Sequence, residues 1–152
     1  EKAITYSYFS PKDTREMRPC TEPFDYHHEK SAEKKSIINK KLFLGLLIEG
    51  SSGVSSIEKI CNNLNKHISL IYFGLYDFTS SLGLKPDWKN KKVIEATKKI
   101  IKICKKKRIM IGSIARNQDE VNFLKKMGIS FVCYQNDTGI IQEAFYRIKN
   151  IK

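Results

Sequence analysis

The sequence of this 152-residue chain has no apolar run long enough to span a membrane. A helix needs about 20 consecutive apolar residues to cross a bilayer, and the runs here are far shorter. The charged N-terminal stretch also contains no apolar segment of the secretory type. These absences argue against a membrane or an exported protein, and we expect a cytoplasmic one.

The motifs of several common site types are also missing. Neither a GxGxxG nor a Walker A loop is present, so nucleotide binding would lack its usual phosphate cradle. No GxSxG sequence positions a serine as a nucleophile. The 4 cysteines include no CxxC pair and no zinc-type spacing with histidine. We predict that they are reduced, and that Cys61, Cys104 and Cys133 are small hydrophobic residues of the core.

Acidic residues are few, with 16 against 28 lysines and arginines, and the formal net charge is +12. Such an excess is typical of proteins that bind nucleic acid or a membrane surface. The lysines, however, are spread along the chain and fall mainly on the polar sides of the expected helices. This distribution argues against a nucleic-acid partner, a question that the salt dependence of binding would decide.

Hydrophobic periodicity divides the chain into an irregular segment, residues 1–28, and one domain, residues 29–152. The first segment contains three prolines and no sustained period, with a short extended piece expected at 4–9. In the second, apolar runs typical of buried strands alternate with amphipathic helical segments. The expected strands are 42–48, 68–74, 108–113 and 129–134, and the expected helices are 29–39, 57–64, 90–105, 117–127 and 138–148.

This alternation predicts an α/β fold with a parallel sheet covered by helices. A flavodoxin-like open sheet has this order of elements, and so does half of a (β/α)8 barrel. In either fold, functional residues lie at the C-terminal ends of the strands. Glu49, Asp77, Ser113 and residues 135–137 occupy those positions.

Glu49 and Asp77 are the candidate metal ligands. If the first two strands are neighbours, the two carboxylates converge on one edge of the sheet, where they repel each other unless a proton or a cation compensates them. Hard oxygen ligands favour Mg²⁺ or Mn²⁺. The alternative is that each acid only stabilises the N-terminus of the helix that follows it.

Several stretches, taken together, resemble the HpcH/HpaI aldolase/citrate lyase family. The sequence YFGLYDFTSSLG at 72–83 is similar to that family's F-I-G-P-x-D-L-S-x-x-x-G motif. The sequences LLIE at 46–49, KMGISFV at 126–132 and NDT at 136–138 follow in family order. Upstream, FSP at 9–11 with Arg15 resembles a degraded form of the family's Tyr-Pro-Pro…G-x-R-G loop.

The resemblance implies a (β/α)8 barrel of the TIM type and a lyase. Such an aldolase makes or cleaves a carbon–carbon bond beside the carbonyl of a pyruvate-like 2-oxo acid, through a metal-stabilised enolate. By their place in the motifs, Glu49 and Asp77 would bind Mg²⁺ or Mn²⁺. Backbone amides around Tyr76 and Asp77 would hold the substrate, and Arg15 would be a further substrate-binding residue.

The chain departs from this family pattern in ways that leave its activity open. A full barrel has about 250 residues, and the resemblance covers only the second half of one. The first half carries the family's general-base histidine and substrate-binding arginine, so the catalytic residues are unknown. The family's glutamine is replaced by Leu47, its proline by Leu75, and its two glycines by Asp13 and Glu16.

Two interpretations follow from these departures. In the first, the chain is a lyase in a homo-oligomer, or together with a partner chain that supplies the N-terminal half-barrel. In the second, it is a noncatalytic half-barrel, either decayed or used as an interaction module.

Overall fold

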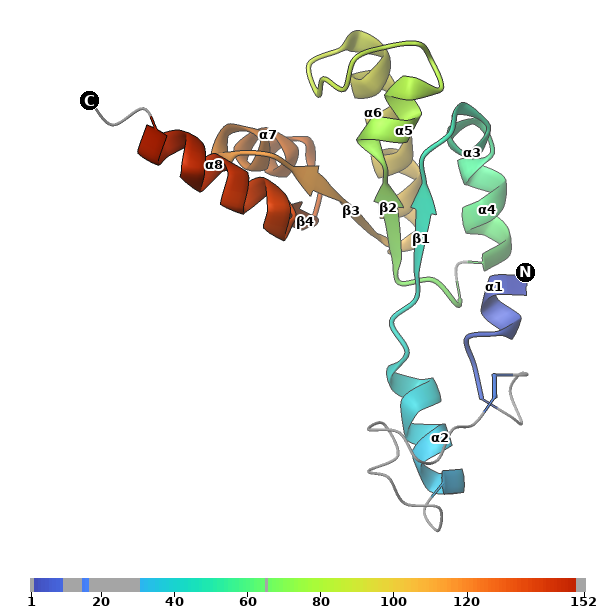
Figure 1. The fold of residues 1–152 in the computed structure, drawn as a ribbon. Helices are drawn as coiled ribbons and strands as arrows, with labels where there is room; N and C mark the ends of the chain where they lie inside the picture. The colour runs from blue at the N-terminus through green and yellow to red at the C-terminus, as the bar shows by residue number, and fades with distance from the viewer. Residues whose placement is uncertain (1, 10–14, 17–30, 65, 150–152) are drawn as a thin grey trace.

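The computed structural model of the chain describes residues 2–9, 15–16, 31–64 and 66–149. Four strands alternate with helices in these residues, in the order that the sequence predicts (Figure 1). Ser10 and Pro11 of the FSP motif, the replacement at Asp13 and the expected helix start at residues 29–30 lie outside the described residues. The elements are α1 (Lys2–Thr5), α2 (Ser31–Lys41), β1 (Gly45–Ile48), α3 (Ser51–Ser55), α4 (Ile57–Leu64), β2 (Leu70–Phe73), α5 (Leu75–Ser80), α6 (Lys91–Lys107), β3 (Met110–Ala115), α7 (Gln118–Met127), β4 (Phe131–Tyr134) and α8 (Asp137–Lys149).

The four strands form one parallel sheet in the order β1-β2-β3-β4. Each strand therefore pairs with the next in the chain, whereas a flavodoxin-like sheet reverses its order near the first strand. Sequential parallel pairing with a helix after each strand is the arrangement of a (β/α)8 barrel. The chain thus has the fold of about half of such a barrel.

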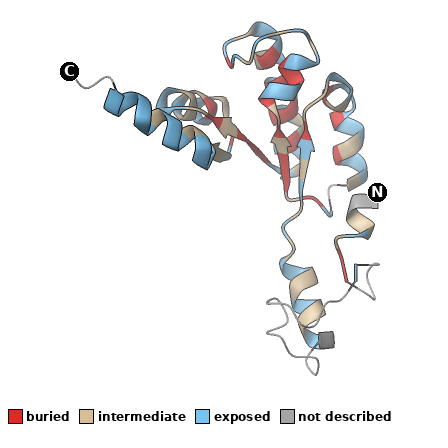
Figure 2. Cartoon of the chain, in the orientation of Figure 1, coloured by how far each residue is buried: buried red, intermediate tan, exposed pale blue. Residues whose placement is uncertain are grey.

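Helices α4, α6 and α7 pack on one face of this sheet. The side chains that point to them include Ile48, Ile71, Phe73 and Ile111, all of which belong to the buried core. Figure 2 shows buried residues gathered where the strands meet α6. Among the described residues, no helix is long and apolar enough to cross a membrane.

The opposite face of the sheet is open and largely apolar. Leu47, Tyr72 and Phe131 share this face through the register of the strands, because Leu47 lies beside Tyr72, Tyr72 beside Gly112, and Gly112 beside Phe131. Leu47 is 55% exposed and Phe131 is 41% exposed. In a closed barrel this face would be the packed interior.

The predicted helix ends are confirmed where capping residues mark them. The side chain of Asn90 accepts a hydrogen bond from Lys92 N, and that of Asn117 accepts one from Glu120 N. Gly128 ends α7 with a φ of 101°, a left-handed conformation that glycine adopts without strain.

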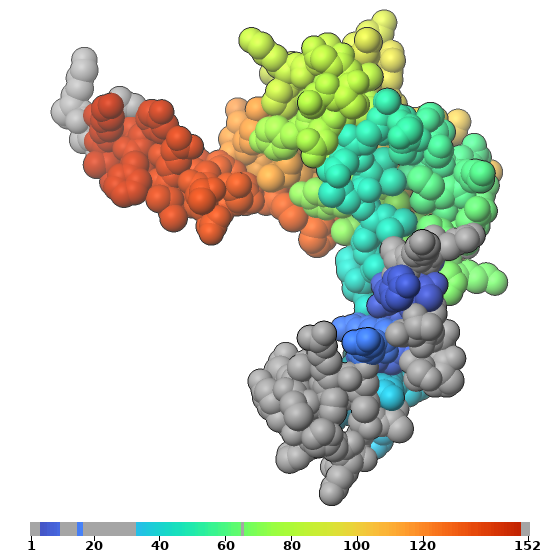
Figure 3. Space-filling view, turned by 45° about the vertical axis from the view of Figure 1, so that its right-hand side comes forward, coloured from blue at the N-terminus to red at the C-terminus, as the bar shows by residue number. Residues whose placement is uncertain are grey.

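Three local expectations were wrong. Instead of the extended piece expected at 4–9, the structure has the end of helix α1, a turn, and a single bridge from Phe9 to Arg15 among the described residues. The first strand begins at Gly45 rather than at residue 42. Cys133, expected in the core, is only half-buried. The helix α8 buries none of its residues and extends away from the rest of the molecule (Figure 3).

Candidate metal site

The candidate site lies where β1 and β2 end. Glu49 directly follows β1, and Asp77 lies in the first turn of α5, which follows β2. Because Ile48 pairs with Phe73, the two strands end side by side, and Gly74 N donates a hydrogen bond to Ile48 O at 3.0 Å. Figure 1 shows both strands pointing to the same end of the sheet. The structure therefore brings together the two acids that the sequence singles out.

The Glu49 and Asp77 carboxyl groups lie close enough to affect each other's protonation. The pKa of Glu49 is raised above its ordinary value, first because the group is partly removed from water, and then because of a hydrogen bond to Asp77 and the negative charge of Asp77. Such proximity is unfavourable when both groups are ionised. A proton or a cation between them would remove that repulsion.

Gly74 provides the space in which the Glu49 side chain lies. A β-carbon added at Gly74 would come within 2.7 Å of Glu49 Cβ and 3.1 Å of its Oε2. Carbon atoms not bonded to each other normally stay about 3.5–4.0 Å apart. The absence of a side chain at Gly74 is thus a condition for the position of the Glu49 carboxylate.

Helix α5 is oriented by what it buries. Leu75, Phe78 and Thr79 are buried, and Thr79 Oγ1 donates to Leu75 O at 2.9 Å. The Phe78 ring also packs against Phe73 of β2, with the ring centroids 5.1 Å apart. With this face fixed, the other two residues of the first turn, Tyr76 and Asp77, are exposed at the end of the sheet.

Arg15 does not join Glu49 and Asp77. Its backbone N donates to Tyr8 O at 2.9 Å, and its guanidinium group lies 4.5 Å from the centre of the Phe9 ring. Tyr8 in turn contacts His67, which precedes β2. Arg15 therefore lies near the N-terminal end of the strands, opposite the two carboxylates.

Sequence reasoning missed Arg116, which follows β3 at the same end of the sheet as Glu49. Its Nε donates to Glu120 Oε1 at 2.9 Å, and its NH1 donates to Pro86 O at 3.4 Å. The pKa of Arg116 is raised, mainly by the Glu120 hydrogen bond. The spacing of Asn117 and Glu120 is typical of a helix N-terminus, but the Glu120 carboxylate accepts a hydrogen bond from Arg116 N, at 2.7 Å, instead of from the cap residue. Arg116 thus joins the loop that precedes α6 to helix α7.

The chemistry of the carboxylate pair fits a magnesium-type ion. In the described part of the chain, no three His, Cys, Asp or Glu side chains are grouped closely enough to hold a metal ion between them. A closed site made only of protein ligands, as structural zinc requires, is therefore not formed by these residues. Mg²⁺ commonly takes only one or two carboxylates and completes its coordination with water and substrate, which is what Glu49 and Asp77 offer.

Comparison with known proteins gives a consistent picture at the level of family and fold. A family model described as HpcH/HpaI aldolase/citrate lyase matches residues 2–144. A search of curated proteins by sequence found no match.

Among solved structures, the chain is similar to an HpcH/HpaI aldolase from Desulfitobacterium hafniense, with a TM-score of 0.81 and 18% identity over 99% of this chain. It is also similar to an HpcH/HpaI aldolase/citrate lyase family protein from Burkholderia cenocepacia, with a TM-score of 0.85 and 16% identity over 97% of this chain. For macrophomate synthase the TM-score is 0.76, with 17% identity over 97% of this chain. The chain spans 59%, 57% and 52% of the lengths of these three proteins.

Proposed function

Because the chain belongs to the HpcH/HpaI aldolase/citrate lyase family, we propose that it forms the metal-binding half of a carbon–carbon lyase acting on a 2-oxo acid such as pyruvate. The observation that carries this proposal is that Glu49 and Asp77 follow the paired ends of β1 and β2, close enough for Asp77 to raise the pKa of Glu49. Active sites of (β/α)8 barrels lie at this end of the strands.

Glu49 and Asp77 would hold the divalent cation, Mg²⁺ or Mn²⁺. When bound, such an ion supplies Lewis-acid stabilisation of the negative charge that develops on the substrate oxygen. The two side chains are suited to this because their mutual repulsion favours a cation between them. Gly74 keeps the Glu49 carboxylate in place, and the buried face of α5 fixes Asp77.

The start of α5 would contact the substrate. Gly74, the residue before α5, provides no side-chain cap, so the backbone N–H groups around Tyr76 and Asp77 are available to an acceptor. A 2-oxo acid offers carboxylate oxygens for this purpose. The role of Arg15 in substrate binding stays a prediction, and we assign it no contact with the carboxylate pair because it lies at the other end of the sheet.

The proposed enzyme needs a second half-barrel. A further set of βα units would cover the open sheet face with Leu47 and Phe131. It would also cover the edges of β1 and β4, which pair with no other strand among the described residues. We propose that these units come from a partner chain or from another part of the same polypeptide. They would also contribute the proton-transferring group, because neither Glu49 nor Asp77 is free for that role while it binds a cation.

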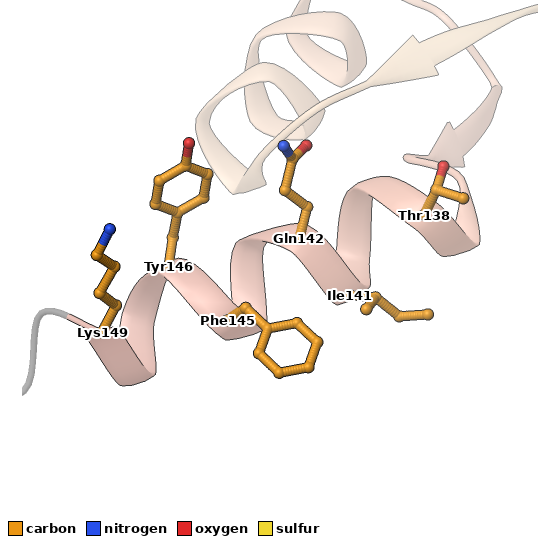
Figure 4. A pocket seen from close by; sticks show the side chains of 6 residues that line it. All are labelled: Thr138, Ile141, Gln142, Phe145, Tyr146 and Lys149. Carbon is orange, nitrogen blue, oxygen red and sulfur yellow. The ribbon is translucent and has the colours of Figure 1, made fainter.

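We also propose that the assembly is a homo-oligomer, and α8 supports this. Ile141 and Phe145, which are 55% and 67% exposed, point away from the rest of the chain (Figure 4). Together with Tyr146 they line a hollow on the helix surface. Large apolar side chains grouped in this way are typical of a surface that another protein covers.

Heat protection by ligands tests the function directly. In the assembled protein, Mn²⁺ together with pyruvate or oxaloacetate is expected to raise the melting temperature, and Asp77→Ala is expected to abolish that rise. Asp119→Ala is the matched control, because Asp119 is likewise an exposed acid in the first turn of a helix, α7. An equal rise in the Asp77→Ala variant would contradict the proposal.

The alternative function is a noncatalytic half-barrel that serves as an interaction module. It is favoured by one observation, that the chain spans little more than half of the structures it resembles. Single-turnover cleavage of oxaloacetate by the assembled protein separates the two functions. Binding of Mn²⁺ without any cleavage would support the interaction module.

A further inference from the structure

The exposed face of α6 is strongly basic. The helix buries Val93, Ile100 and Cys104 in the core, and the residues on its opposite side face solvent. The exposed residues of α6 comprise one acid, Glu95, and seven lysines: Lys91, Lys92, Lys98, Lys99, Lys102, Lys105 and Lys106. Lysines that are spread along the sequence therefore gather on one side of the folded chain.

The positive charge continues onto the end of α7. A β-carbon added at Gly128 would lie 3.1 Å from Lys105 Nζ, so the Lys105 side chain reaches the C-terminal cap of α7. Lys125 and Lys126 are exposed in the last turn of this helix, whereas its acids lie in the first turn, at the opposite end. Together with the seven exposed lysines of α6, these two form what we call the basic face.

The charges of the basic face have no acidic partners within the part of the chain that the structure describes. The ion pairs found there join Arg116 to Glu120 and Arg147 to Glu143, and neither includes a lysine of this face. Interaction with the helix dipole favours cations in the last turn of a helix only. It therefore explains the end of α6 but not the lysines of its first half.

We propose that the basic face binds the phosphate backbone of double-stranded nucleic acid. A helix of 17 residues is about 25 Å long, and one strand of a duplex carries about seven phosphates over that length. Lysine ammonium groups bind phosphates as point charges. The proposal departs from the expectation drawn from the sequence, in which the spread of the lysines argued against such a partner, and it does not depend on the lyase function.

The composition of the basic face favours a polyanion over a protein or a membrane. Among the residues that the structure describes, α4, α6 and α7 expose no large apolar side chain. Protein interfaces, in contrast, are depleted of lysine and have apolar centres. Helices that lie on a membrane insert apolar side chains beside their basic ones. The basic face offers only charge, which is what a phosphate backbone requires.

Fluorescence anisotropy with a labelled DNA duplex that is longer than the span of α6 tests the proposal. The assembled protein is titrated into the duplex at several KCl concentrations. We expect binding whose affinity falls linearly with salt concentration on a double-logarithmic plot, because each lysine that contacts a phosphate releases counterions. Duplexes of different base sequence should bind equally, since phosphate contacts carry no sequence information.

A pair of neutralising substitutions assigns the binding to α6. Lys98→Gln/Lys102→Gln is expected to weaken binding and to reduce the salt slope by about 2, since each lost phosphate contact reduces it by about 1. Lys40→Gln/Lys41→Gln is the matched control and should leave the slope unchanged. These two lysines are likewise exposed, but they end α2, which lies apart from α6 (Figure 1).

A second variant and a second probe complete the test. Lys105→Gln/Lys106→Gln, at the other end of the basic face, replaces the first variant if that one does not fold. The proposal is overturned if the wild type does not bind the duplex at low salt, or if the α6 variant and the wild type have the same salt slope. Binding to vesicles of phosphatidylcholine and phosphatidylserine, without binding to the duplex, would also overturn it and assign the basic face to a membrane surface.

Discussion

Replacing Gly74 by alanine is the sharpest perturbation of the candidate site. Gly74 has φ −86° and ψ 102°, a conformation open to alanine, so the substitution strains no backbone angle. The new β-carbon would lie 2.7 Å from Glu49 Cβ, whereas unstrained carbon contacts are about 3.5–4.0 Å. Because a Cβ atom moves only with its backbone, the chain at Glu49 or at residue 74 must shift by about 1 Å, which displaces the Glu49 carboxylate.

A displacement of this size matters for a metal ligand. Coordination distances vary by only about 0.2 Å around their preferred values, so Glu49 would lose its contact with a cation that Asp77 still holds. Residues that only support a ligand typically change metal affinity by about 10- to 100-fold when they are mutated. We expect a loss of Mn²⁺ affinity in this range for Gly74→Ala.

The assay is a Mn²⁺ titration of the assembled protein, in which free Mn²⁺ is followed by electron paramagnetic resonance. Gly50→Ala is the matched control, since Gly50 is adjacent to Glu49 and an added β-carbon there meets only Ser52 Oγ, at 3.8 Å. Circular dichroism verifies that both variants are folded. If Gly74→Ala binds Mn²⁺ as tightly as the wild type, the argument about the position of Glu49 is refuted.

Three further substitutions test other parts of the account. The pKa of Glu49 is raised in the folded chain above its ordinary 4.5, so this group contributes most stability below pH 4.5 and its contribution is lost as pH rises through the raised pKa. Glu49→Gln should therefore raise the metal-free melting temperature at pH 7 and flatten its pH dependence. A lower melting temperature would count against the interaction with Asp77. Ser113→Ala removes a buried hydrogen bond of 2.6 Å that Ser113 Oγ donates to Phe73 O. It should lower the free energy of unfolding, measured in urea, by about 1–2 kcal/mol. An unchanged midpoint of urea unfolding would contradict the importance of that bond. Phe131→Lys changes a 41% exposed side chain on the open sheet face. It should leave the stability of the separate chain nearly unchanged but prevent assembly with a second half-barrel, as followed by size-exclusion chromatography. Normal assembly would argue that this face is not the interface.

Much of the fold was predictable because strong local signals agreed with the tertiary structure. The helix α6 carries its apolar residues at helical spacing, and Val93, Ile100 and Cys104 are indeed fully buried. The predicted start at residue 90 lies within one position of the observed start at Lys91, where Asn90 caps the helix. Where period, cap and burial point to the same answer, sequence reasoning is accurate.

The choice between a barrel and an open sheet was not predictable from the residues alone. Continuously apolar strands fit both, because the order of strands in a sheet depends on contacts far apart in the sequence. The same limit explains α8: a helical stripe with Ile141 and Phe145 predicts a covered face, but it does not say which protein surface covers it.

In the candidate site, too, sequence reasoning found some residues and missed others. Glu49 and Asp77 were found because the ends of neighbouring parallel strands meet by geometry. Arg116 was missed because its partners, Pro86 and Glu120, come together only in the folded chain. Arg15 shows another limit of sequence reasoning, because a motif assigns a residue to a site without showing at which end of the sheet the residue lies.

Direct Mn²⁺ binding is the measurement closest to the central claim, that Glu49 and Asp77 form one divalent-cation site. The assembled wild-type protein is compared with Asp77→Ala and with Asp119→Ala, by electron paramagnetic resonance at the same pH and ionic strength. We predict that the wild type and Asp119→Ala bind Mn²⁺ with equal affinity and that Asp77→Ala loses this binding. Equal binding by all three proteins would contradict the claim.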